Sequence, residues 1–167
     1  HDPKRVKIIW SGATHQDRGR FMRWDGGLQF SGGEITSIQP LNIYTAKYGI
    51  DEWSETHAKW RSVTSGQEEG VLLDIEGPDD AVINFKAGPA VFSFTLGEVR
   101  NSELRWDLGG LEQYVTASTQ HTDGGTPDLT FEFTDETPGA GDQAYWTRVV
   151  QTDFHRAWSS PIYLTTS

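Results

Sequence analysis

Apolar residues recur at every second position in several short segments of this chain. Val71, Leu73 and Ile75 follow this spacing, and Phe131 and Phe133 repeat it between Thr and Glu residues. Successive side chains of a β-strand point to opposite faces of a sheet, so the spacing gives each strand one apolar and one polar face. The pattern predicts half-buried antiparallel strands, with Phe131 and Phe133 in the core.

Clusters of Gly, Pro and Asp separate these segments at intervals close to the ~8–12 residues that are typical of sandwiches and barrels. The turn-forming clusters lie at residues 25–27, 31–33, 76–79, 86–89, 109–110 and 123–125. Roughly a dozen candidate strands result, which is enough for two packed sheets. We therefore predict an all-β chain, a two-sheet antiparallel β-sandwich of fibronectin-like or jelly-roll-like type. We expect it to form a single domain over residues 1–167.

Residues 45–60 interrupt the alternation. Ile50, Trp53, His57 and Trp60 have the spacing of one face of a short helix, for which Asp51 would be the N-cap. The other interpretation is a long loop with an ordered turn, which we favour on the usual lengths of connections. Long loops on a rigid sandwich often carry binding residues. The sequence thus predicts a long loop or a short helix in this region.

The charge and composition exclude several classes of partner and site. The net charge is −10, and an acidic surface repels the phosphates of nucleic acids and of anionic membranes. The absence of cysteine excludes disulfides, thiolate zinc sites and a cysteine nucleophile. No apolar run approaches the ~20 residues that span a bilayer. Residues 1–5 precede no apolar segment, so no signal peptide is expected here, and the compartment stays open.

The last third of the chain carries a recognisable pattern. Its parts are residues 131–135, 138–142, 145–153 and 156–163, which include Ala-Trp-Ser-Ser-Pro-Ile at 157–162. The pattern resembles the C-terminal β-sandwich tail of a poorly characterised bacterial family of polymerase-and-histidinol-phosphatase-like metallohydrolases. Residues 6–12 and 20–26 are similar to the beginning of that tail, and the middle of the chain is unmatched.

The resemblance implies an accessory part without the enzyme. The His-x-His and Asp motifs of the family's catalytic part do not occur here, so no catalytic residue is carried over. Gly-x-Ser-x-Gly elbows and phosphate-binding loops are also missing. We expect a non-catalytic domain of a larger bacterial hydrolase-like protein, with which a periplasmic or secreted location is compatible. Its expected partner is the catalytic domain of that protein or a homologous subunit, against which it packs.

A carbohydrate-binding module is the alternative function. Tyr48, Trp53 and Trp60 lie near His57 and several charged residues in the irregular region. Exposed aromatic rings can stack on the apolar face of a sugar while polar neighbours bind its hydroxyl groups. The other interpretation of these rings is that they cover one end of the sandwich as a small core.

Acidic residues gather around the turn at residues 76–79. Asp74, Glu76, Asp79 and Asp80 provide the oxygen ligands that Ca²⁺ prefers, although their spacing is not that of an EF-hand. Aspartate is also a common turn former whose side chain bonds the local backbone. A structural Ca²⁺ site and ordinary turn chemistry are both open at this point.

The histidines are too far apart in sequence to indicate a preorganised metal site. They are His1, His15, His57, His121 and His155. If His1 is a mature N-terminus, its amine and imidazole could chelate copper with a second histidine, as in proteins that resemble lytic polysaccharide monooxygenases. Surface histidines without a cofactor are the simpler interpretation.

Overall fold

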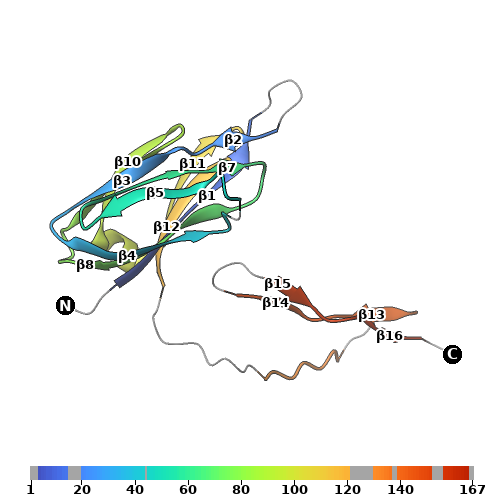
Figure 1. Cartoon of the computed structure of the whole chain (residues 1–167). Coiled ribbons are helices and arrows are strands. Elements are labelled where there is room, and N and C mark those ends of the chain that lie inside the picture. Colours follow the sequence, from blue (N-terminus) through green and yellow to red (C-terminus); the bar gives the residue numbers. More distant parts are fainter. Residues whose placement is uncertain are drawn as a thin grey trace. The chain divides into compact units, whose positions relative to one another are not determined.

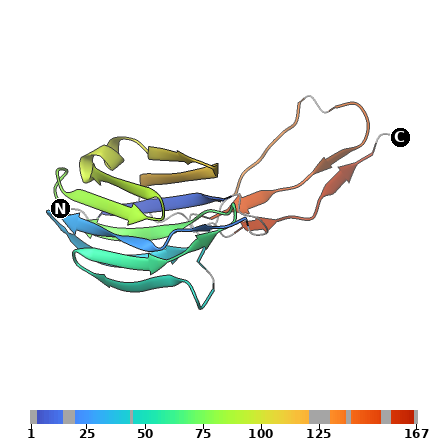
Figure 2. The same ribbon diagram turned by 90° about the horizontal axis from the view of Figure 1, so that it is seen from above.

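The computed structural model of the chain describes residues 4–14, 20–43, 45–120, 130–136, 139–151 and 156–165. They divide into two compact units, residues 1–122 and 123–167. The predicted all-β antiparallel sandwich is confirmed, and both of its sheets lie in the first unit (Figures 1 and 2). The organisation of residues 1–167 as a single domain stays a prediction.

The first sheet has five antiparallel strands in the order β11-β12-β1-β8-β4. Their bounds are β1 (Lys4–Ala13), β4 (Glu34–Leu41), β8 (Glu69–Glu76), β11 (Leu104–Gly109) and β12 (Leu111–Gln120). In β8, which lies between β1 and β4, Val71, Leu73 and Ile75 are fully buried, as their alternation predicts. The apolar face of this sheet therefore points into the sandwich.

The second sheet also has five antiparallel strands, in the order β10-β9-β3-β6-β5. Their bounds are β3 (Gly26–Ser31), β5 (Gly49–Ser54), β6 (His57–Arg61), β9 (Val82–Ala87) and β10 (Ala90–Thr95). In β9 the buried residues Ile83 and Phe85 alternate with the exposed residues Asn84 and Lys86. One face of this sheet thus completes the core, and the other face meets solvent.

Aromatic rings from both sheets meet in the core. The Trp10 and Trp60 rings are stacked with their centroids 5.0 Å apart, and the Phe85 ring lies 5.7 Å from that of Trp60. The chain of contacts continues from Phe85 to Phe92 and from Phe92 to Trp106 at centroid distances of 4.8 and 3.7 Å. These rings link the facing sheets, because Trp10 and Trp106 come from the first sheet.

The prediction of a loop or a helix at residues 45–60 is wrong. Strands β5 and β6 form a hairpin there, and β6 also pairs with β3. Ala58 and Trp60 alternate with the more exposed residues Lys59 and Arg61, which is the spacing of a strand. Hydrogen bonding to β3 and burial of Trp60 outweigh the helix-like spacing of the aromatic residues.

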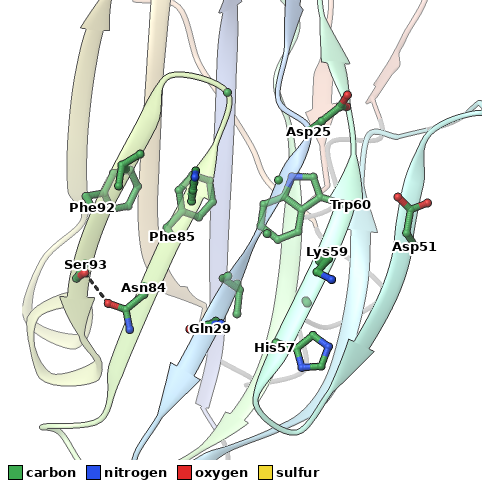
Figure 3. A pocket seen from close by; sticks show the side chains of 17 residues that line it. Asp25, Gln29, Asp51, His57, Lys59, Trp60, Asn84, Phe85, Phe92 and Ser93 are labelled. Carbon is green, nitrogen blue, oxygen red and sulfur yellow. Dashed lines mark hydrogen bonds between the residues drawn. The ribbon is translucent and has the colours of Figure 1, made fainter.

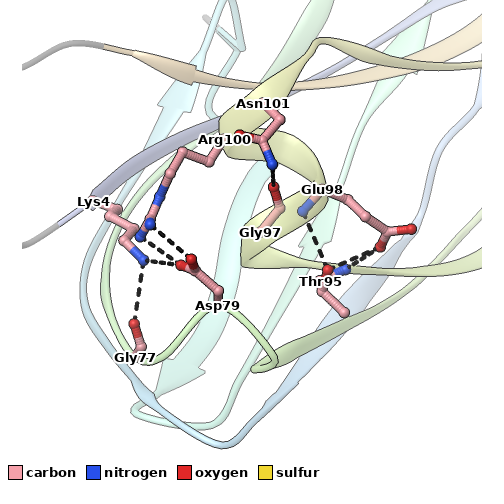
Figure 4. A network of polar contacts seen from close by, with 8 residues as sticks. All are labelled: Lys4, Gly77, Asp79, Thr95, Gly97, Glu98, Arg100 and Asn101. Atoms are coloured by element: carbon pink, nitrogen blue, oxygen red, sulfur yellow. Dashed lines mark hydrogen bonds and ion pairs between the residues drawn. The ribbon is translucent and has the colours of Figure 1, made fainter.

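A short helix, α1 (Leu96–Asn101), lies at one end of the sandwich (Figure 2). Thr95 and Glu98 form a capping box, in which the Thr95 hydroxyl accepts a hydrogen bond from the Glu98 amide. Arg100 at the other end of the helix pairs with Asp79 at 2.6 Å, and Lys4 pairs with Asp79 at 3.1 Å (Figure 4). These contacts join the helix to the turn after β8 and to the start of β1.

The first unit also contains a separate two-stranded sheet, in which β2 (Met22–Arg23) pairs with β7 (Val63–Thr64). No helix within the described residues is long and apolar enough to cross a bilayer.

The second unit contains two ribbons of two antiparallel strands each (Figure 1). Strand β13 (Gln143–Tyr145) pairs with β16 (Ile162–Leu164), and β14 (Arg148–Val150) pairs with β15 (Arg156–Trp158). Every residue of β14, β15 and β16 is exposed.

The prediction that Phe131 and Phe133 belong to the core is wrong. Their side chains are 61% and 76% exposed, and residues 130–136 contain no strand. Alternation fixes the two faces of a strand only where a neighbouring strand supplies hydrogen bonds. Among the described residues no segment pairs with residues 130–136.

Candidate functional site: a hollow on the outer face of the second sheet

Two rows of side chains cross the solvent face of the second sheet. In the first row, neighbouring strands pair Ser93 with Asn84, Asn84 with Gln29, Gln29 with His57, and His57 with Ser54. Paired residues of adjacent strands place their side chains on the same face. The first row is therefore a continuous line of polar groups across all five strands.

The second row lies next to the first and has a gap at its centre. It pairs Val91 with Lys86, Lys86 with Gly27, Gly27 with Lys59, and Lys59 with Glu52. Gly27 has no side chain, so the two lysines flank open space above the middle strand.

This open space is a hollow of about 990 Å³, which we call the outer hollow (Figure 3). Gln29, His57, Lys59, Asn84 and Lys86 line it together with other residues of the five strands of this sheet. Its volume falls within the range of small-ligand sites in proteins. The outer hollow is therefore large enough to hold a ligand of several rings.

The backbone fixes the gap at Gly27. A Cβ atom on Gly27 would lie 2.2 Å from the carbonyl oxygen of Ala58, and one on Gly26 would lie 2.1 Å from that of Lys86. Only glycine permits this close approach of the strands. The hollow is therefore a property of the sheet itself rather than of one side-chain rotamer.

Some polar groups of the outer hollow are already paired and others are not. The Ser93 hydroxyl donates to Asn84 Oδ1 at 2.7 Å, which leaves the Asn84 NH₂ group available. His57 Nδ1 lies 2.8 Å from Ser54 Oγ. Within the part of the chain that the structure describes, Gln29 and Lys86 make no side-chain hydrogen bond or ion pair. Unpaired amide and ammonium groups are available to a ligand.

The acidic groups at the edge of the hollow are held by cations. Arg61 donates hydrogen bonds from Nε and Nη2 to the Asp51 carboxylate at 2.7 to 3.0 Å, and these bonds lower the pKa of the Asp51 carboxyl. Lys59 pairs with Glu52 at 2.5 Å and lowers the pKa of that carboxyl in the same way. Both acids therefore stay ionised and paired near neutral pH.

The structure separates the residues of the predicted sugar platform. Trp60 is only 1% exposed and stacks in the core, so its prediction as a stacking surface is wrong. Trp53 is 47% exposed, but its cross-strand partner is the buried Ala58, which places Trp53 on the core side of the sheet edge. Tyr48 is half-buried in the turn before β5. Of the four residues, His57 and Trp60 line the outer hollow, but the Trp60 side chain is buried in the core.

The four acids at the turn after β8 do not assemble a calcium site. Asp74 is engaged by Arg5 at 2.7 Å, and Asp79 is shared between two cations, as described above. Glu76 and Asp80 lie nearby in sequence, but the described residues contain no cluster of three or more acidic or histidine side chains. The oxygens of Asp74 and Asp79 stabilise the fold through ion pairs instead.

The copper hypothesis concerns residues outside those described. His1, His15, His121 and His155 all lie there, so an N-terminal copper site stays a prediction.

A second polar cluster joins β1 and the start of β8 to the segment between β6 and β8. The Trp10 indole donates to Ser62 Oγ at 2.7 Å, and the Ser62 hydroxyl donates to Glu69 Oε2 at 2.6 Å. The Gln67 amide donates to Glu69 Oε1 at 3.1 Å. Glu69 is 7% exposed, and its burial raises the pKa of its carboxyl. This network satisfies the hydrogen-bonding groups of the buried side chains of Trp10, Ser62 and Glu69.

Sequence reasoning missed the central residues of the outer hollow. It interpreted Gly26 and Gly27 as part of a turn, whereas they begin β3 in the middle of a sheet. The alternation of Asn84 and Lys86 with Ile83 and Phe85 was a usable signal, because it assigns both polar residues to the solvent face.

Comparisons with known protein families, with characterised proteins and with solved structures found no match for this chain. The arrangement of its residues therefore carries the functional argument.

Proposed function

We propose that the chain is a non-catalytic accessory module that docks, through its second unit, on the catalytic domain of a larger bacterial hydrolase-like protein or on a homologous subunit. One observation supports this proposal above all. Among the described residues of the second unit, nine large apolar side chains are 46–76% exposed: Phe131, Phe133, Trp146, Val149, Val150, Trp158, Ile162, Tyr163 and Leu164.

The amount of exposed apolar surface favours a docking role. Monomeric proteins expose single apolar residues without consequence, but large groups of them mark surfaces that bind another protein. The second unit places such residues on both strands of the β14–β15 ribbon and on β16. A two-stranded ribbon is marginally stable in water on its own, so a covering partner would stabilise it.

The resemblance noted in the sequence supports the same role. The segments that resemble the C-terminal tail of the metallohydrolase family include β14, β15 and β16. The exposed apolar residues and the family-like pattern thus coincide in the same strands. The first unit has its own core.

Light scattering and binding of an apolar fluorescent dye to the purified chain test the proposal. The uncovered surface should bind the dye or drive self-association, and replacing Trp158 and Ile162 with Thr should weaken both. Val91→Thr is the matched control, because Val91 is 71% exposed but lies in the first unit. A monomer that binds no dye would show that the chain covers this surface itself, and would overturn the docking role.

A further inference from the structure

We infer that the outer hollow is a binding site for a carboxylated oligosaccharide, a chain of uronic acid units that lies across β9, β3 and β6. This site belongs to the first unit and is independent of the proposed docking surface. It also differs from an aromatic sugar platform, because the ligand rests on glycine backbone and is held by amides and an ammonium group.

The shape of the outer hollow fits a flat ring. Gly26 and Gly27 present bare backbone at the floor, so a ring can approach the sheet more closely there than over any larger residue. Val91, which is 71% exposed, lies in the same row on the far side of Lys86 and offers an apolar surface at the edge of the hollow. A pyranose ring has an apolar face made of C–H groups, so one sugar unit can lie on the glycine backbone while another unit of the same oligosaccharide lies against Val91.

The first polar row fits the hydroxyl groups of such a ligand. Gln29, Asn84 and His57 come from three adjacent strands, which are spaced about 4.8 Å apart in a sheet. Each side chain can donate and accept hydrogen bonds, as pairs of neighbouring sugar hydroxyls require. Figure 3 shows the Asn84 and Gln29 side chains on the same face of the sheet as His57.

The charge of the outer hollow favours a carboxylate on the sugar. The Glu52 carboxylate already neutralises Lys59, whereas Lys86 has no ion pair among the described residues. A carboxylate would supply that partner and form a charge-assisted hydrogen bond. Asp25 and Asp51, which also line the hollow, are each paired with an arginine, at 3.5 Å to Arg23 and at 2.7 Å to Arg61.

The test uses the tetramer of galacturonic acid and its fully methyl-esterified form, titrated into the whole chain by calorimetry. The two probes share their rings and hydroxyl groups and differ only in the carboxylates. We expect the acidic tetramer to bind roughly three- to fivefold more tightly than the ester, since an ion pair at an exposed lysine has a modest effect. Added salt should reduce this difference.

Three variants identify the residues that bind. Lys86→Gln should abolish the preference for the acidic tetramer, and Gln29→Ala should weaken binding of both probes. Lys47→Gln, which removes the same charge from an exposed turn outside the hollow, should change neither. All three positions are exposed, so thermal melting should show that each variant is folded.

Each outcome of the titrations has a defined meaning. Equal binding of the acidic and esterified tetramers would overturn the carboxylate assignment. Failure of both to bind, or an equal effect of Lys47→Gln and Lys86→Gln, would overturn the site itself. Neither result would affect the docking surface of the second unit, which light scattering tests separately.

Discussion

Replacing Trp60 with alanine should destabilise the first unit severely, because the structure places this residue in the core rather than on a binding surface. Trp60 is 1% exposed, stacks on Trp10 at 5.0 Å, and donates its indole N–H to the Trp24 carbonyl oxygen at 2.9 Å. The substitution would leave a cavity and an unpaired buried carbonyl group.

The expected magnitude follows from these contacts. Truncation of a buried tryptophan costs about 3–5 kcal/mol. The lost hydrogen bond and ring stacking add to this value in part, which gives about 4–6 kcal/mol in total. Since domains are stable by only about 5–15 kcal/mol, Trp60→Ala should be close to unfolded at room temperature. Trp60→Phe, which keeps a ring and loses the N–H donor, should cost about 1–2 kcal/mol and remain measurable.

Trp53→Ala is the matched control. Trp53 is 47% exposed, so its truncation removes far less buried area and should cost about 1 kcal/mol. Unfolding in guanidinium chloride, followed by circular dichroism, gives the free energy of unfolding of each variant. If Trp60→Ala destabilises the chain no more than Trp53→Ala does, the assignment of Trp60 to the core is wrong.

Two further substitutions test the first unit. Burial raises the pKa of Glu69 above its ordinary value of 4.5, so its contribution to stability is present below that pH and is lost as the pH rises through the raised pKa. The free energy of unfolding of Glu69→Gln should therefore rise relative to that of the wild type as the pH increases from 4.5 through the raised pKa, and a difference that is constant with pH would contradict the burial argument. Thr95→Ala removes the capping box of α1 and should cost about 1 kcal/mol in thermal unfolding, while Thr95→Ser retains most of the stability. Equal melting temperatures for the alanine and serine variants would show that the cap contributes nothing.

The alternation of apolar residues predicted the strands that pair within the sandwich. Val71, Leu73 and Ile75 are buried as expected, because β8 lies between two other strands and one of its faces must meet the opposite sheet. The same pattern failed at Phe131 and Phe133, where no described strand pairs with their segment. Local spacing encodes the two faces of a strand but does not encode its partner.

The candidate site was less predictable than the fold. The sequence predicted Trp60 as an exposed ring of a sugar platform. Its burial depends on the pairing of β6 with β3, and these strands are distant in the sequence. The outer hollow depends on Gly27 lying between Lys59 and Lys86, which come from two different hairpins. Only the register of the sheet brings these three residues into one row.

Hydrogen–deuterium exchange of the isolated chain tests most directly the claim that the first unit is complete and the second unit awaits a partner. The account predicts slow exchange for the amides of β1 and β8 and fast exchange for those of β14, β15 and β16 in the monomer. A monomeric chain in which both sets of amides exchange equally slowly would contradict it, since the exposed strands would then be covered without any partner.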